Sequence, residues 1–544
     1  MPPLVLLLLL TSAGPLAAQF ASERFVSAGV CSDCHSRLYP PGVAPNWNGM
    51  TIVHRGEAPT PIDARSIAPY ALWSASMMAH SAADPYWQAK LRFETARTPS
   101  AAKAIEDKCL SCHAPMQQYD ARAAGGLPFA ALNAVGAQGV SCTVCHQISP
   151  ANLGKPESFS AGFEINTRRE IYGPHPNPFP MPMRMHTGRT PTFSAHMLDS
   201  ALCGACHILI TPTLDAAGKQ TGEFLEQATY LEWASSSFAR EGRSCQSCHL
   251  PRLEDADGQP LRQYIAHTPH GGYFGPIRPR EPFGQHAFGS ANVQMLGILA
   301  EKDSPKAELL NAAADRGRRL LAGGLTVELE AARQAGHIEA TVRLRNTAGH
   351  KFPSGFPSRR LWLHLNVRDG AGAVRFESGA WNPGTGEIRS LEAQSAGVEP
   401  HHARITSPAQ TQIYEVELGD SAGAPTVSLL RAARALKDNR LLPVGFVDAS
   451  GVPPELRRFS LAPAATGADP DFIPGGDTTP YQIPAPGGQG PWTIEVEALY
   501  QSIKPAHTRV FHSGASKEEA AFLQAFNPRH RAPVVVGRAS VSVR

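Results

Sequence analysis

The sequence predicts an α+β protein in which a mainly α-helical and irregular domain is followed by an antiparallel β-sandwich. Two observations support this prediction. The pattern CxxCH occurs five times, always before residue 250, and from about residue 323 apolar and polar residues begin to alternate. At 544 residues the chain is long enough for about two or three domains, each with its own core.

We expect four segments along the chain. An apolar run, Leu4 to Leu10, is followed by small residues ending at Ala18, which is typical of a secretory signal. That run is too short to span a membrane, and no later stretch reaches about 18 consecutive apolar residues. The mature chain is therefore expected to be exported without a transmembrane span, with an uncleaved anchor as the alternative. The segments are 1–18 (signal peptide), 19–290 (motif-bearing domain), 291–322 (helical bridge) and 323–544 (β-sandwich domain).

The five motifs are the chemically specific part of the sequence. They read CSDCH (31–35), CLSCH (109–113), CTVCH (142–146), CGACH (203–207) and CQSCH (245–249), and they contain all ten cysteines. No cysteine remains to link distant parts of the chain by a disulfide. Zinc ribbons need two pairs for each metal, and a thioredoxin-like dithiol would be needed once, so neither explains a histidine after each of five pairs.

Covalent attachment of c-type haem explains every feature of the motifs. The two thiols form thioethers to one porphyrin, and the adjacent histidine binds the iron. The sequence therefore predicts five haem c groups. The predicted attachment residues are Cys31, Cys34, Cys109, Cys112, Cys142, Cys145, Cys203, Cys206, Cys245 and Cys248, and the predicted proximal ligands are His35, His113, His146, His207 and His249.

The remaining histidines can supply the sixth iron ligands. The chain has 21 histidines, so 16 remain after the proximal five. We expect His80, after two methionines, and His286, before a helix-like stretch, to be distal ligands. The other candidates are His350 in a Gly- and Pro-rich turn, His270, and His175, His186 and His196 between the third and fourth motifs, of which His175 and His196 are favoured. Methionines of FPMPMRMH (179–186) are an alternative source of an axial ligand.

Helices are expected at 84–96, 222–238 and 292–321, the last being the bridge. Strands are expected at LTVELEA, HIEATVRLRN, RLWLHLNVRD, TQIYEVELGD, WTIEVEALYQSI and VVVGRASVSVR. In the third strand Leu361, Leu363, Leu365 and Val367 share one face. Several such strands separated by turn residues predict a sandwich of immunoglobulin-like architecture without cysteine.

At this point the residues resemble a known family. WSASMMAHSAADPYW, CLSCHAP, GVSCTVCH, LCGACH, CQSCHLP and QHAFGSANVQML resemble the multihaem c-type cytochromes related to the tetrahaem cytochrome that accepts electrons from hydroxylamine oxidoreductase. AGHKFPSGFPSRR, KDNRLLPVGF and FIPGGDTTPYQI look like the β-domain of some bacterial members. The resemblance implies a periplasmic electron carrier with closely packed, mainly bis-histidine haems, and it supports His80 and, less firmly, His286 and His350 as distal ligands. The chain departs from the family in having five motifs and a large second domain.

These observations predict a periplasmic cytochrome that carries electrons between redox protein partners. No catalytic constellation is recognisable, so electron transfer is expected rather than catalysis. The alternative is an oxidoreductase of a small inorganic nitrogen or sulfur compound, which needs one haem with an open coordination position. The formal charge of +3 and the absence of long basic runs argue against nucleic acid as a partner.

Overall fold

The computed structural model describes residues 22, 24–36, 52–55, 58–61, 67–255, 257–268, 274–389, 391, 397–484 and 488–544. The predicted signal segment and His270 lie outside these residues. Within them the chain combines helices with mainly antiparallel sheets, which confirms the α+β class. No described helix has the length and apolar character that a membrane span requires.

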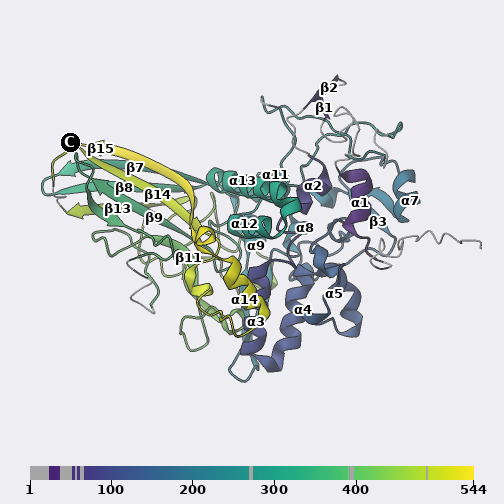
Figure 1. Ribbon diagram of the computed structural model, residues 1–544, viewed down its shortest axis with the longest axis horizontal. Coiled ribbons are helices and arrows are strands. Elements are labelled where there is room, and N and C mark those ends of the chain that lie inside the picture. Colours follow the sequence, from purple (N-terminus) through teal and green to yellow (C-terminus); the bar gives the residue numbers. More distant parts are fainter. Residues whose placement is uncertain are drawn as a thin grey trace, which may run out of the picture.

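The first half of the chain, here called the motif region (residues 24–302), is built from short elements (Figure 1). Some of its helices begin after a residue whose side chain caps the first turn. Helix α3, for example, starts after Asp84, whose carboxylate accepts hydrogen bonds from the N–H groups of Tyr86 and Trp87. The described helices of this region are α1 (Ala28–His35), α2 (Pro69–Ser74), α3 (Pro85–Arg97), α4 (Ala102–His113), α5 (Pro115–Ala121), α6 (Cys142–Cys145), α7 (Met181–Thr187), α8 (Ser200–Gly204), α9 (Thr229–Ala234), α10 (Ser237–Arg240), α11 (Cys245–His249) and α12 (Val293–Lys302).

Three two-stranded pairs complete the motif region. They are β1 (Ile52–Arg55) with β2 (Ala58–Pro61), β3 (Glu170–Gly173) with β4 (Thr190–Phe193), and β5 (Leu209–Leu214) with β6 (Gln220–Gln227). The helix expected at 84–96 is confirmed by α3, but the one expected at 222–238 is wrong, because its first half forms strand β6 and only the second half is helical. Pairing with β5 outweighs the helical pattern of that segment.

The predicted bridge is two helices rather than one. Helix α12 ends at Lys302, and α13 (Ala307–Gly323) begins after a short 3-10 turn, Ser304–Lys306. Pro305 lies in that turn, and proline inside an α-helix removes a hydrogen bond and clashes with the preceding turn. The two helices pack against each other, so the segment is compact.

The second half, here called the β-region (residues 325–544), contains two antiparallel sheets. One has the order β12-β11-β9-β14-β15, with β10 also paired to β9, and the other has the order β13-β8-β7. All six predicted strands are confirmed. The strands are β7 (Leu325–Gln334), β8 (His337–Asn346), β9 (Arg360–Arg368), β10 (Val374–Ser378), β11 (Ile413–Gly419), β12 (Arg434–Asp438), β13 (Gly476–Pro484), β14 (Trp492–Gln501) and β15 (Val534–Val543), with helices α14 (Lys517–Ala525) and α15 (Pro528–Arg531) before the last.

Both sheets contribute to one hydrophobic core. The predicted face of β9 is confirmed, since Leu361, Leu363, Leu365 and Val367 are all fully buried in it. The opposite face is more apolar than alternation suggested. Trp362 is also fully buried there, in a second cluster with neighbouring strands. Strand β9 is therefore covered on both faces, as its central position in the sheet requires.

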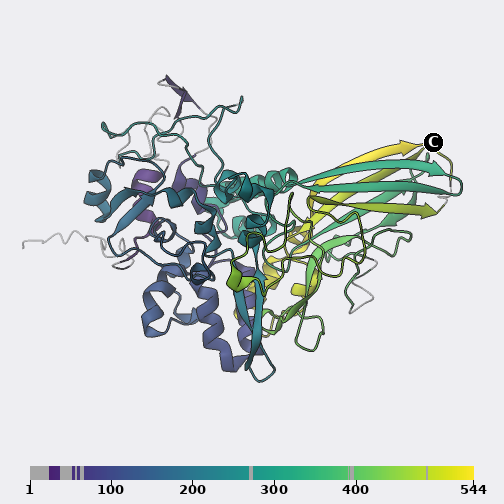
Figure 2. The ribbon, with the colours of Figure 1, turned by 180° about the vertical axis from the view of Figure 1, so that it is seen from behind.

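The C-terminal part of the β-region packs against the motif region. Figures 1 and 2 show the motif region at one end of the molecule and the sheets extending from it, with α1 and α7 far from the tip of the sheets. Helix α14, from the end of the chain, packs beside α3. Their shared cluster includes Tyr86, Phe511 and Phe522, with ring centroids 5.5–6.0 Å apart. Aromatic packing of this kind fixes the two regions against each other.

Candidate haem centres

All five motifs line one continuous cavity of about 1650 Å³. Its walls include all ten cysteines and the five motif histidines, together with β-region residues such as Phe352 and Tyr500. Within a motif the two cysteines lie three positions apart, as in the helical turns of α1, α6 and α11, so both sulfurs face the same side. The motifs, up to 218 positions apart in sequence between Cys31 and His249, therefore present their thiols to a common interior.

Backbone carbonyl groups orient four of the five motif imidazoles. In each, Nδ1 lies at hydrogen-bonding distance from a carbonyl oxygen and can donate to it. The pairs are His35 with Ile265 (2.6 Å), His113 with Ser81 (2.8 Å), His146 with Tyr172 (2.6 Å) and His249 with Gly289 (2.8 Å). This arrangement places the proton on Nδ1 and leaves the electron pair of Nε2 for a metal. The rings thus fit the role of axial ligands to iron.

Burial keeps these imidazoles neutral. It lowers the pKa of His35, His113 and His207 to about 4, and it lowers the pKa of His146 and His249. A neutral ring is the form that can bind a metal. His113 is held further by Trp87, whose ring stacks on it with a centroid separation of 4.4 Å and an interplanar angle of 9°.

Two motif histidines face a second histidine across the cavity. The ring centroids of His146 and His286 are 6.1 Å apart, and those of His249 and His350 are 6.4 Å apart. A metal–imidazole bond is about 2.0 Å long, so two rings that share one metal have facing nitrogens about 4 Å apart and centroids roughly 6 Å apart. Both pairs have the spacing that one intervening iron requires.

The β-region presents His350 from the loop between β8 and β9. A buried charged network holds the neighbouring residues of that loop. The Glu232 carboxylate, on α9 of the motif region, accepts hydrogen bonds from the N–H of Lys351 (3.2 Å), Ser354 Oγ (2.6 Å) and Arg440 Nη1 (2.9 Å). Asp438 pairs with Lys351 Nζ at 2.7 Å and with Arg440 Nη2 at 2.8 Å. Because Glu232 is fully buried, the network locks the loop to the motif region.

The other predicted distal ligands are divided between two environments. His175 lines the cavity, as does His186, whose Nε2 lies 2.9 Å from Asp33 Oδ2 beside the first motif. His80 and His196 do not line it. His80 Nε2 lies 3.0 Å from the carbonyl oxygen of Ser74, and His196 Nε2 lies 3.1 Å from that of Ile148. Around His80 the chain forms a turn after α2.

Thiols of different motifs approach one another. Cys142 acts as a hydrogen-bond partner of Cys31, which with burial raises the pKa of Cys31 well above its usual range. In the same way, a hydrogen bond with Cys112 raises the pKa of Cys206, and one with Cys245 raises the pKa of Cys203. Cys145 of the third motif is close enough to both Cys203 and Cys206 to raise their pKa electrostatically. The first motif is thus next to the third, and the fourth next to the second, third and fifth.

Sequence reasoning missed the residues that orient the ligands. Ser81, Tyr172, Ile265 and Gly289 act through backbone carbonyls, which any residue type provides. Glu232 lies within EQATYLEW (226–233), a stretch that carries no recognisable motif. A glutamate beside a tryptophan in a short helix is no signal of burial.

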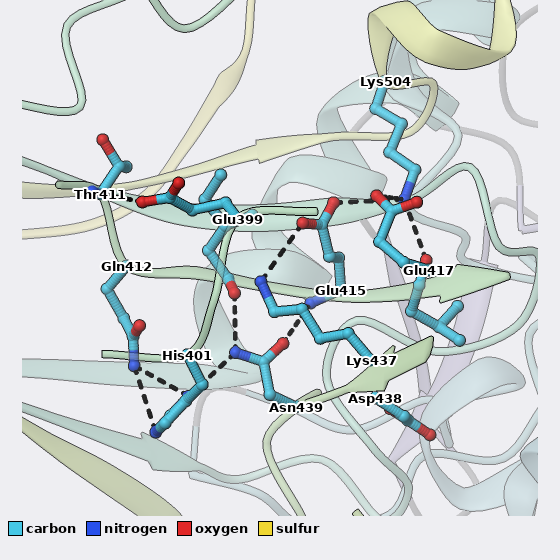
Figure 3. A network of polar contacts seen from close by, with 12 residues as sticks. Glu399, His401, Thr411, Gln412, Glu415, Glu417, Lys437, Asp438, Asn439 and Lys504 are labelled. Carbon is cyan, nitrogen blue, oxygen red and sulfur yellow. Dashed lines mark hydrogen bonds and ion pairs between the residues drawn. The ribbon is translucent and has the colours of Figure 1, made fainter. Parts of the chain in front are cut away.

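A second cluster of potential metal ligands lies in the β-region, where ligand atoms of His401, Asp469 and Asp477 are within 4.8 Å of one another. Figure 3 shows the surrounding polar network. The Asn439 Oδ1 atom accepts from the N–H of Glu415, and its Nδ2 atom donates to the carbonyl of Ile413. These contacts fix the orientation of the amide, so Nδ2 is also the donor to His401 Nδ1 at 3.0 Å. The proton of His401 is therefore on Nε2, which donates to Asp469 Oδ2 at 3.0 Å. With both ring nitrogens engaged, this cluster is a structural hydrogen-bond network.

A family model matches part of the motif region. Residues 68–147, which contain the second and third motifs, match the family model described as cytochrome c554 and c-prime. No curated protein matches the chain. The chain is similar to the crystal structure of a penta-heme cytochrome c552 from Thermochromatium tepidum, with 17% identity, a TM-score of 0.48, and coverage of 87% of this chain and 95% of that one. The family match supports a multihaem c-type cytochrome with haem c as its cofactor.

Proposed function

We propose that the protein is a periplasmic c-type cytochrome that carries electrons between redox protein partners through five covalently bound haems. The observation that carries this proposal is the single cavity onto which all five CxxCH motifs open. Haem iron stores one electron by cycling between its ferric and ferrous forms. This chain would supply the thioether sulfurs, the axial imidazoles and the cavity that holds them in place.

The contacts between motifs suggest a branched path for electrons. Cys31 adjoins Cys142, and Cys145 adjoins the fourth motif, which gives an order of first, third and fourth haem. The fourth motif also touches the second through Cys112 and the fifth through Cys245. Haems held by neighbouring cysteines would lie close to one another. The fourth haem would therefore be the junction, with the first, second and fifth at the ends.

The proposed distal ligands are His286 for the third haem and His350 for the fifth, because each faces the motif histidine at the spacing of an axial pair. His175 lines the cavity and is a further candidate, whereas His186 lines it beside the first motif with its Nε2 bound to Asp33. We leave His80 and His196 out of this set, since their Nε2 atoms lie at backbone carbonyl oxygens and neither residue lines the cavity. We further infer that the β-region is an immunoglobulin-like sandwich, which the shared core of its two sheets supports.

One observation favours a second function. Among the described residues, no histidine ring pairs across the cavity with His113 or His207 in the way that His286 and His350 do. A haem left with an open position at the second or fourth motif could bind a small inorganic nitrogen or sulfur compound, as an oxidoreductase requires. Met77 and Met78 line the same cavity and offer the alternative of thioether coordination.

Low-temperature electron paramagnetic resonance of the purified ferric protein, with haem content quantified beside it, separates these functions. The carrier predicts five haems for each chain, all with low-spin signals. A high-spin signal that responds to nitrite, cyanide or sulfite would identify an open iron and support the oxidoreductase. A protein that holds no covalent haem, or whose haems accept no electrons from any one-electron donor, would contradict both.

A further inference from the structure

A buried carboxylate in the cavity has no role in haem attachment or in the charged networks described above. Glu226 lies next to the end of strand β6, is 6% exposed, and lines the cavity. Its Oε2 atom has no hydrogen-bond partner among the described residues, and Oε1 has only the Gln227 side-chain amide at 3.5 Å. A carboxylate left unsatisfied in a protein interior is costly unless it can bind a proton.

Nearby charges do not neutralise this carboxylate. Lys90 and Glu94, both on α3, pair with each other at 3.0 Å. Both also bind the β-region, because Lys90 Nζ donates to the carbonyl of Val427 at 2.6 Å and Glu94 accepts from Ser428 Oγ at 2.7 Å. Lys108, on α4, is half-buried at the cavity wall and has no ion-pair partner within 4.0 Å among the described residues. Glu226 and Lys108 are thus opposite charges that face the cavity without a salt bridge between them.

Both groups are neighbours of the second motif. Lys108 directly precedes Cys109, and its charge also acts on Cys112. Burial raises the pKa of Cys109, and the Glu226 carboxylate raises it further, so Glu226 lies within electrostatic reach of this attachment site. Charges interact strongly in a low-dielectric interior, so a change of one charge at this haem would change the proton affinity of Glu226.

We propose that Glu226 binds a proton when the haem attached at Cys109 and Cys112 is reduced and releases it when that haem is oxidised. The inference rests on the proposed function, because it requires that haem to exchange electrons. One electron arrives from a one-electron donor protein, and one proton from water forms an O–H bond with the carboxylate. On oxidation the electron leaves to an acceptor protein and the proton returns to water, so the charge of the site is conserved in both steps.

The environment of Glu226 sets the pH range in which this exchange operates. Burial raises its pKa to about 7, Glu94 raises it, and Lys90 and Lys108 lower it. The added electron of the reduced state makes the site more negative and raises that pKa further. Between the two pKa values reduction takes up a proton, so the reduction potential of this haem falls as pH rises.

The test is a potentiometric titration of the haem-loaded full-length protein, followed by visible absorbance between about pH 6 and pH 8. One couple is expected to shift by up to about tenfold in its reduction equilibrium for each pH unit, equivalent to about 59 mV. Glu226→Gln, which keeps the shape of the side chain, should abolish that shift and hold the couple near its low-pH value. Glu223→Gln, at an exposed position of the same strand, should leave the shift unchanged.

A second variant keeps the inference testable if Glu226→Gln does not load haem. Lys108→Gln removes a positive charge that lowers the pKa of Glu226, so the pH range of the shift should move upward. An unmoved range, or equal pH dependence in the wild type and Glu226→Gln, would overturn the inference. In those cases the haems still show reversible redox couples, so the proposed electron-transfer function is not contradicted. Loss of all reversible couples in the wild type would instead overturn the proposed function.

Discussion

The motif region and the β-region fill their interiors differently. The β-region buries a continuous set of aliphatic side chains from two sheets, among them Leu344, Leu363 and Val496. The motif region has short elements around a cavity of about 1650 Å³, and its own apolar clusters are small. Side chains alone do not pack this interior as closely as an ordinary protein core. The difference teaches that the β-region forms its core from its own side chains, whereas the motif region leaves a cavity that the proposed haems would fill.

The largest effect is expected from removing the attachment cysteines of the proposed junction haem. Cys203→Ala combined with Cys206→Ala deletes thiols that adjoin those of the second and fifth motifs. We expect the haem-to-protein ratio to fall by more than one and the motif region to become sensitive to protease while the β-region stays resistant. Haem quantification and mass spectrometry of limited digests check this. Cys31→Ala with Cys34→Ala, at one end of the path, is the matched control and should remove only one haem. Equal losses in the two variants would contradict the junction.

A core mutation in the β-region should show the reverse pattern. Leu363 is fully buried on the central strand β9, so Leu363→Ala should lower the free energy of unfolding by about 2–5 kcal/mol. Because the β-region holds no motif, haem content should not change. Urea unfolding followed by far-ultraviolet circular dichroism measures the loss. Val374→Ala, at a position 44% exposed on β10, should change the free energy by less than about 0.5 kcal/mol. A fall in haem content in Leu363→Ala would show that the two interiors are not separable.

Acid should weaken the β-region through a buried network that Figure 3 shows. Burial by itself raises the pKa of Glu415, but Lys504 and Lys437 outweigh it and lower that pKa to about 2, from an ordinary 4.5. A carboxyl whose folded pKa is depressed stabilises the fold above its unfolded pKa and loses that contribution as pH falls. Stability should therefore decline by about 3 kcal/mol between pH 4.5 and pH 2, the window these two values define.

Glu417 gives this pH prediction a control. Burial raises its pKa to about 7, so its contribution has the opposite sign and stability is lost as pH rises from 4.5 towards 7. Glu417→Gln should remove the loss of stability between pH 4.5 and pH 7 and leave the loss of stability below pH 4.5 unchanged. Thermal unfolding measured from pH 2 to pH 7 checks both changes in stability. If Glu415→Gln still loses stability below pH 4.5, other groups cause that loss.

The smallest effect is expected where the two regions are joined. Glu232→Gln removes the carboxylate that holds the His350 loop, which should cost about 1–3 kcal/mol because Arg440 keeps Asp438 as a partner. We also expect a partial high-spin signal as His350 gains freedom, measured by electron paramagnetic resonance. His350→Ala should give the full signal at one haem. Glu241→Gln, at an exposed position after α10, should change neither property. A purely low-spin spectrum in both His350→Ala and Glu232→Gln would remove His350 from the proposed ligands.

Several elements could be predicted from sequence because their determinants are local. Alternation marked all six strands that were predicted, since a strand in a two-sided sheet places successive residues on opposite faces. Strand β13 was missed because it contains Pro480 and Pro484, and proline is tolerated there only because β13 lies at the edge of its sheet. Residues 222–227 were expected to be helical and form a strand because β5 pairs with them, which is a contact that the segment itself does not encode.

The sequence by itself determined the attachment chemistry, because two thioethers and the adjacent ligand require Cys, Cys and His within five consecutive residues. It could not determine which histidine lies opposite each iron. His350 follows His249 by 101 positions, and only the docking of the β-region through Glu232 brings the two rings within 6.4 Å. The neighbours of each motif, the carbonyls that orient the imidazoles and the unpaired carboxylate of Glu226 likewise depend on the folded chain. Covalent attachment depends on residues that are adjacent in the sequence, whereas ligand pairing and burial depend on contacts between residues that are far apart in it.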